Sequence, residues 1–215
     1  MSPSSDESPG APPTEVASKM KMDYLHGAKD PTTKALEDFN PLLARIAVKE
    51  YDLNALYKEC ATLISRDFGL SSVCIAVWVP SAQQYRFKAT CGLRSDGDSI
   101  YQKLWYTKSD MKDDRTYPYH EISAQTRLYL AEDHPFAPGQ EATFMRPGLI
   151  GMKRRSVTEA LEVDYVCTYF FDSKQEILGW IEYSGTRMGK LPDASTIRWV
   201  EFVAQLLGIA TSLKA

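Results

Sequence analysis

The fold of this chain is decided by ILGWIEYS, residues 177–184, together with the stretch before it, DYVCTYFF, residues 164–171. Both stretches are dense in β-branched and aromatic residues, and the polar residues 172–176 join them, which predicts a β-hairpin. Neither stretch alternates cleanly between apolar and polar residues, so both are expected to be central strands with covered faces. Gly179 indicates either a bulge or room for another group above the sheet.

A long helix is predicted after this hairpin. Residues 185–192 form a loop, and Asp193 can cap the helix because its carboxylate accepts from the first free amides. Apolar residues then recur at helical spacing as far as Leu213. The helix therefore has two surfaces to bury, one on the sheet and one on another helix or another subunit.

Length, charge and cysteine spacing limit the classes of function. The chain has 215 residues, a formal net charge of −3 and a pI near 5.7, which gives no basic field for nucleic acid. No apolar run reaches membrane-spanning length and no signal peptide is visible, so we expect no nucleic-acid partner, no membrane contact and a cytoplasmic location. The four cysteines are widely separated, which favours buried free thiols and predicts no metal-binding residues.

The N-terminal third divides into a tail and a helix. Residues 1–30 are expected to be a disordered or weakly ordered tail, because Ser, Pro and Gly at its start cannot form a core, and residues 31–215 a single domain. Asn40 and Pro41 indicate the start of a helix over residues 40–68, with Asp52 able to restart it.

A second hairpin is predicted from residues 72–79 and 85–92. If Pro80 faces Tyr85, the register places Cys74 opposite Cys91, and alternate residues of the second strand share a face. The first of these strands is apolar on both faces and belongs inside the sheet. The second is half-polar and belongs nearer an edge.

The middle of the chain, residues 93–163, is less regular. We expect a helix over residues 99–106, strands at 117–122 and 127–131, a loop over 132–147 and a short helix over 156–161. Long irregular connections inside a compact domain usually cover a binding cavity. This region is therefore expected to form the lid and walls of a pocket.

This order of elements resembles that of GAF domains over residues 40–213, and LGWIEY, residues 178–183, is similar to a strand pattern near the end of that family. The resemblance implies an α+β, GAF/PAS-like fold with an antiparallel sheet of about six strands. It places the N- and C-terminal helices on one face of the sheet and a pocket on the other. It also implies a non-catalytic, small-molecule-binding or signal-sensing regulatory module that acts through protein association, with a signalling protein as a further partner.

The motifs of the ligand-specific GAF groups are absent. Only Lys190 and Asp193 match the signature of the cyclic-nucleotide-binding members, and neither His120 nor His134 has the neighbouring Cys that bilin-binding members use. A single histidine can ligate haem, but ordinary polar contacts are the commoner role of histidine. The cofactor and the ligand are therefore unknown from the sequence.

Aromatic residues of the middle region and of the central hairpin are the candidate pocket residues, since aromatics with polar tips suit an apolar pocket with a few directed hydrogen bonds. For any one of them, filling the core is the alternative. No catalytic residue is predicted. The ligand-binding candidates are Trp105, Tyr129, Phe144, Cys167, Tyr169 and Trp180.

Two alternative functions stay open. A GAF-fold thiol reductase of the methionine sulfoxide type would depend on Cys167 or on a Cys74/Cys91 pair, but neither has a polar, electropositive context. A ligand-free dimerisation or adaptor module would use the two terminal helices. A homodimer through residues 40–68 and 193–213 is expected in any case, with Leu206 as an outward apolar position.

Overall fold

The computed structural model describes residues 13–26 and 31–214. Four short 3₁₀ turns lie at Asp110–Lys112, Ala131–Asp133, Glu141–Thr143 and Pro147–Leu149. The helices are α1 (Pro13–His26), α2 (Pro31–Ala47), α3 (Leu53–Asp67), α4 (Ser95–Tyr101) and α5 (Ala194–Lys214). The strands are β1 (Val73–Val79), β2 (Gln84–Cys91), β3 (Trp105–Tyr106), β4 (His120–Ser123), β5 (Thr126–Tyr129), β6 (Tyr165–Phe171) and β7 (Ile177–Tyr183).

The described strands form one antiparallel sheet in the order β3-β2-β1-β7-β6-β5-β4. The two predicted hairpins form four adjacent inner strands, β2, β1, β7 and β6, and β1 and β7 pair with each other to join the hairpins. The sequence predicted about six strands, and the structure has seven because the two-residue β3 extends the edge beside β2.

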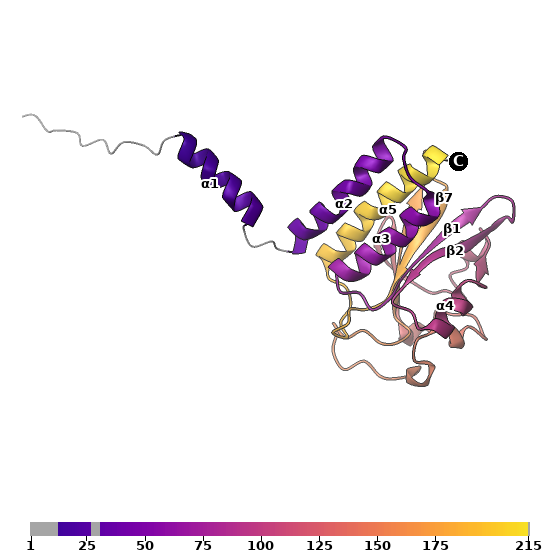
Figure 1. Ribbon diagram of the computed structural model, residues 1–215. Helices are drawn as coiled ribbons and strands as arrows, with labels where there is room; N and C mark the ends of the chain where they lie inside the picture. The colour runs from indigo at the N-terminus through magenta and orange to yellow at the C-terminus, as the bar shows by residue number, and fades with distance from the viewer. Residues whose placement is uncertain (1–12, 27–30, 215) are drawn as a thin grey trace, which may run out of the picture.

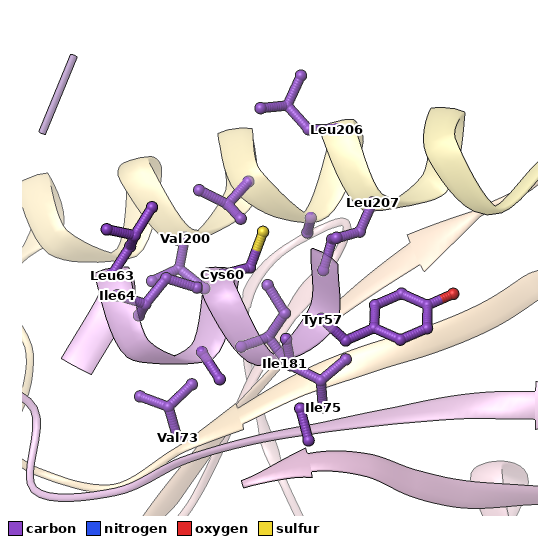
Figure 2. Packing of buried hydrophobic residues seen from close by; sticks show 14 of the residues in the cluster. Tyr57, Cys60, Leu63, Ile64, Val73, Ile75, Ile181, Val200, Leu206 and Leu207 are labelled. Atoms are coloured by element: carbon purple, nitrogen blue, oxygen red, sulfur yellow. The ribbon is translucent and has the colours of Figure 1, made fainter. Parts of the chain in front are cut away.

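Three helices cover one face of the sheet, while the irregular middle region lies on the other (Figure 1). Helix α3 packs on β1 and β2, α5 packs on β6 and β7, and α2 packs against α3. The Phe39 ring of α2 stacks on Trp199 of α5 at 6.4 Å. Figure 2 shows aliphatic side chains of α3, α5, β1 and β7 meeting in this layer. The α+β architecture predicted from the sequence is confirmed.

The predicted helix over residues 40–68 is two helices. Pro41 lies inside α2, which begins at Pro31 and buries Phe39, Leu42 and Ile46 along one side, so tertiary packing carries the helix across the proline. Lys49 then turns to φ 60° and the Glu50 amide bonds to the Arg45 carbonyl, which ends the helix as a glycine more often does. Asp52 caps α3 through the Ala55 amide at 2.8 Å, as predicted.

Two β-bulges change the predicted registers. In β2 the extra residue is Lys88, so Cys74 pairs with Thr90 rather than with Cys91. The bulge also separates Phe87, which packs with the residues opposite the helices, from Ala89, which packs beneath them. In β7 the extra residue is Leu178, beside Gly179.

Gly179 has a second reason to lack a side chain. A Cβ atom there would lie 2.2 Å from the Ala76 carbonyl oxygen and 2.5 Å from Cζ of Phe170. The glycine therefore admits the Phe170 ring into the layer under the helices.

The middle region differs from its predicted boundaries. The helix expected over residues 99–106 is α4, which ends at Tyr101, and residues 156–161 form a turn rather than a helix, with Glu159 bridging to Lys190. In the predicted tail, residues 1–12 and 27–30 lie outside the described residues, and α1 between them has exposed side chains from Thr14 to His26. No described helix is long and apolar enough to cross a membrane.

Candidate functional site

A cavity of about 550 Å³ lies on the face of the sheet opposite the helices. Its floor is formed by β5, β6 and β7, and its walls come from α4, β3 and the irregular segments between β3 and β6. This volume falls within the range of small-molecule sites in proteins. The chain therefore has room for a ligand where the irregular middle region was expected to enclose one.

Side chains of the floor form rows across neighbouring strands. Glu182 of β7 pairs with Cys167 of β6, which pairs with Arg127 of β5. Two residues away along the same strands, Trp180 of β7 pairs with Tyr169 of β6. Because alternate residues of a strand face the same side, these rows all point into the cavity.

Aromatic rings dominate the lining. Eight of the 12 tyrosines of the chain line the cavity, together with Trp180 and two phenylalanines. The Trp180 ring lies 5.7 Å from that of Tyr106 and 6.3 Å from that of Tyr169, and the rings of Tyr129 and Tyr165 stack at 4.4 Å. The wall is thus apolar in area but carries many hydroxyl groups that can make directed hydrogen bonds.

The carboxyl group of Glu182 lies among these rings. Its Oε1 atom accepts a hydrogen bond from the Tyr101 hydroxyl at 2.8 Å. Burial raises its pKa above the ordinary value, and the hydrogen bonds from Tyr101 and Trp180 offset that rise only in part. No ion pair to Glu182 is found among the described residues.

The guanidinium of Arg127, unlike the carboxyl group of Glu182, has contacts within the protein that stabilise its charge. The guanidinium lies 4.1 Å from the ring centre of Tyr119 and 4.9 Å from that of Tyr169, within cation–π range. One of its nitrogens also donates to the Met111 carbonyl oxygen at 3.2 Å. The positive charge is therefore already stabilised by the protein.

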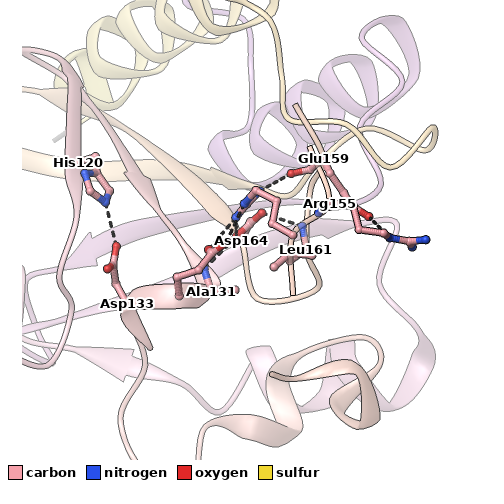
Figure 3. A network of polar contacts seen from close by, with 9 residues as sticks. His120, Ala131, Asp133, Arg155, Glu159, Leu161 and Asp164 are labelled. Atoms are coloured by element: carbon pink, nitrogen blue, oxygen red, sulfur yellow. Dashed lines mark hydrogen bonds and ion pairs between the residues drawn. The ribbon is translucent and has the colours of Figure 1, made fainter. Parts of the chain in front are cut away.

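A polar network fixes one side of the cavity (Figure 3). The buried Asp164 carboxylate accepts from the Ala131 amide at 2.9 Å, from the Leu161 amide at 2.7 Å and from Arg154 at 2.9 Å. Arg154 also donates to both oxygens of Glu132, and these two carboxylates raise the pKa of its guanidinium. The network ties the wall segments to the end of β5.

The structure brings five of the six predicted site residues to the cavity: Tyr129, Phe144, Cys167, Tyr169 and Trp180. Trp180 is only 3% exposed, so it contributes a ring face to the wall rather than a side chain standing free. The prediction for Trp105 needs correction. This residue is 51% exposed and lies away from the cavity, because β3 alternates so that its neighbour Tyr106 points inward.

Sequence reasoning left several lining residues out of the site, namely Tyr101, Tyr106, Arg127 and Tyr165. Glu182 was expected on the same face as Trp180, as the polar rim of the cavity wall, although it was not among the ligand-binding candidates. The period of two within the hairpin could also have given Tyr165, since it alternates with Cys167 and Tyr169. Tyr101 and Tyr106 belong to the middle region, whose fold depends on contacts distant in sequence.

The cysteines and histidines do not form a reactive group. Burial raises the pKa of the Cys74 and Cys167 thiols well above the ordinary value, and that of Cys60 to about 12. Thiols with raised pKa values are poor nucleophiles. His120 bonds to Asp133 at 2.8 Å, no histidine lines the cavity, and the described residues contain no group of ligands that could hold a metal ion.

No known family profile matches the chain, and no curated protein matches it in sequence. Solved structures do match. The phycoerythrobilin-bound GAF domain of a cyanobacterial phytochrome has a TM-score of 0.56 at 10% identity, over 85% of this chain and 96% of that one. The A. aeolicus NlH2 GAF domain in an inactive state has a TM-score of 0.55 at 12% identity, over 86% of this chain and 100% of that one.

A third structure is the GAF domain of a phosphoenolpyruvate-protein phosphotransferase from Coxiella burnetii. It has a TM-score of 0.53 at 13% identity, over 86% of this chain and 96% of that one. Such low identities carry no information on activity, but three unrelated proteins share the same architecture with this one. The resemblance inferred from the strand and helix order is confirmed at the level of structure: the chain has the GAF fold.

Proposed function

We propose that this protein is a non-catalytic sensor module that binds a small molecule in the cavity and signals through association with other proteins. The observation that carries this proposal is the cavity of about 550 Å³ walled by aromatic rings and a few polar groups. One structural neighbour is a GAF domain bound to phycoerythrobilin, so this architecture can hold a small molecule.

Native mass spectrometry of freshly purified protein tests the proposal directly. A retained small molecule, or a metabolite that raises the melting temperature in a screen, is the expected result, because ligand bound only to the folded state stabilises it. Tryptophan fluorescence should respond as well, since Trp180 lies on the wall. If no retained mass appears and no compound shifts the melting temperature, the sensor proposal fails.

The thiol-reductase alternative gains no support from the site. Cys167 is the cysteine that lines the cavity, but burial raises its pKa and nearby Glu182 raises it further. A catalytic thiol needs the opposite environment. We therefore keep the non-catalytic role.

For association, we propose a homodimer through the outer side of α5. Phe202, Ile209 and Leu213 are exposed there at helical spacing, and Ile209 is 54% exposed. The expectation that Leu206 is an outward apolar position of this interface needs correction. Leu206 is 8% exposed and belongs to the buried cluster of Figure 2, so Leu206→Glu would damage the fold of one chain.

Ile209→Glu is the sharper test. Analytical ultracentrifugation should give a dimer for the unchanged protein and a folded monomer for this variant. Met188→Glu is the matched control, because Met188 is also exposed but lies in the loop before α5 and should leave the dimer intact. A monomeric unchanged protein at high micromolar concentration contradicts the dimer. The signalling partner and the cytoplasmic location stay predictions.

A further inference from the structure

The carboxylates of the cavity wall differ in how they are neutralised. Four of the five receive strong hydrogen bonds or an ion pair from the protein: Asp110 from the Thr107 amide, Asp113 from the Arg115 and Thr116 amides, Glu162 from Arg146, and Asp164 from Arg154. Glu182 receives only neutral donors. Among the described wall residues it is therefore the carboxylate most in need of a positive partner.

The surroundings of Glu182 are uncharged and aromatic. The titratable groups that interact electrostatically with Glu182 are the hydroxyls of Tyr101, Tyr106 and Tyr165 and the thiols of Cys74 and Cys167. Its strand neighbour on the same face, Trp180, adds an indole ring. Rings of this kind attract a cation through their electron-rich faces, and the attraction grows where water is excluded.

Arg127 does not form an ion pair with the Glu182 carboxylate. Two strand spacings separate it from Glu182, about 10 Å between backbones. Its charge is occupied by the rings of Tyr119 and Tyr169 and by the Met111 carbonyl. For the same reason it is a weaker site for an anionic ligand than a guanidinium without such contacts, since its faces and one of its donors are already used.

We infer that the ligand of this cavity is a small organic cation, a protonated amine or a quaternary ammonium group, whose charge lies against the Glu182 carboxylate inside the cage of Tyr101, Tyr106, Tyr165 and Trp180. This inference rests on the proposed sensor function and assigns its ligand class. The carboxylate supplies the charge, and the rings supply apolar contact and cation–π attraction. The rest of the molecule would occupy the aromatic space toward Tyr129 and Tyr169.

Two matched sets of probes test the inference. The first is phenethylammonium with its neutral analogue phenethyl alcohol and the anion hydrocinnamate. The second is choline with its neutral carbon isostere. Isothermal titration and melting temperature are measured for each probe with the full-length protein. Both cations should bind at least about tenfold more tightly than their neutral partners, because a hydrogen bond or contact to a charged group contributes more than a neutral one.

Variants locate the cation. Glu182→Gln keeps the shape and the hydrogen bond from Tyr101 but removes the charge, and it should weaken both cations by about 10- to 100-fold without changing the affinity for the neutral probes. Glu162→Gln is the matched control on the same wall, where Arg146 already neutralises the carboxylate, and it should leave cation affinity within about twofold of the unchanged protein. Circular dichroism confirms that each variant is folded.

Trp180→Phe tests the aromatic part of the site separately, since it should lower the affinity for both cations while the Glu182 carboxylate is still present.

The outcomes separate this inference from the proposed function. If neutral or anionic probes bind as tightly as the cations, or if Glu182→Gln leaves cation binding unchanged, the cavity still binds small molecules but the cation inference is overturned. If no probe binds and native mass spectrometry finds no retained molecule, both proposals are overturned. Selective loss of the cations in Glu182→Gln supports both.

Discussion

The two faces of the sheet show how one set of strands can serve two purposes. Under the helices, mostly aliphatic side chains and the ring of Phe170 form a close-packed layer, part of which Figure 2 shows. Its few polar groups bond to one another, as the Tyr57 and Thr211 hydroxyls do. On the opposite face, tyrosines, Trp180 and Glu182 surround a cavity. The difference arises within single strands, because alternate residues point to opposite faces. One side stabilises the fold, and the other keeps space open at some cost in stability.

The largest contrast is expected between two aromatic truncations. Phe170→Ala removes a ring with 0% exposure beneath the helices and should lower the free energy of unfolding by about 3–5 kcal/mol. Tyr117→Ala removes a half-buried ring from the cavity wall, where its loss enlarges an existing space, and should cost about 1 kcal/mol. Urea unfolding measures both. Equal costs would mean that the cavity face is packed as tightly as the helix face.

The next contrast concerns the close approach at Gly179. Gly179→Ala places a methyl group against the Ala76 carbonyl and the Phe170 ring, so backbone or ring must shift, at about 1–3 kcal/mol. Gly148→Ala is the control, since no atom lies within 4 Å of its Cβ position and it should change stability by less than about 0.5 kcal/mol. A tolerated Gly179→Ala would show that the bulge alone explains the glycine.

Local signals predicted much of the fold. The two hairpins, the caps Asp52 and Asp193 and the order of the elements follow from composition and capping chemistry, which act over a few residues. The helix end at Lys49 was missed because a residue other than glycine adopts the left-handed conformation there.

The faces of the strands were harder to predict than the strands themselves. A single extra residue at Lys88 or Leu178 moves the remainder of a strand to the other face. Gly179 indicated the bulge beside Leu178, whereas no local signal marks the bulge at Lys88. Strict alternation puts Leu178 on the cavity face with Trp180 and Glu182, and Ile177 on the opposite face. The bulge reverses the positions of Leu178 and Ile177, while Trp180 and Glu182 do line the cavity.

Site residues in the middle region, 93–163, were the hardest to predict from the sequence. Trp105 and Tyr106 are both aromatic and adjacent, and only the pairing of β3 with β2 decides that Tyr106 lines the cavity. That pairing is a contact between residues distant in sequence, and no periodic pattern in the chain predicts it. The cavity could be expected from the length of the irregular region, and Glu182 from its alternation with Trp180. That Glu182 has no ion-pair partner among the described residues could be learned only from the structure.

The smallest effect expected, and the one that bears most on function, is the pH dependence introduced by Glu182. Burial raises the pKa of this carboxyl above its ordinary value of 4.5, so the folded protein holds the proton more tightly than the unfolded chain does. The contribution of this carboxyl group to stability is therefore fully present below pH 4.5 and is lost as the pH rises through its folded-state pKa. The facing tyrosines and thiols have raised pKa values and stay neutral, and Arg127 across β6 stays charged, so Glu182 is the group that titrates.

Glu182→Gln should therefore raise the melting temperature of the ligand-free protein at about pH 8, and the gain should shrink toward pH 4, where the carboxyl of the unchanged protein is itself neutral. A gain of about 1 kcal/mol would appear as about 2–4 °C in a chain of this size. Scanning calorimetry across this pH range measures it, with Glu162→Gln as the control that loses an ion pair to Arg146 and gains nothing. A variant less stable than the unchanged protein at pH 8 would mean that the charge of Glu182 already has a partner within the fold. A gain confined to high pH would mean that the cavity keeps a destabilising charge for a ligand to neutralise.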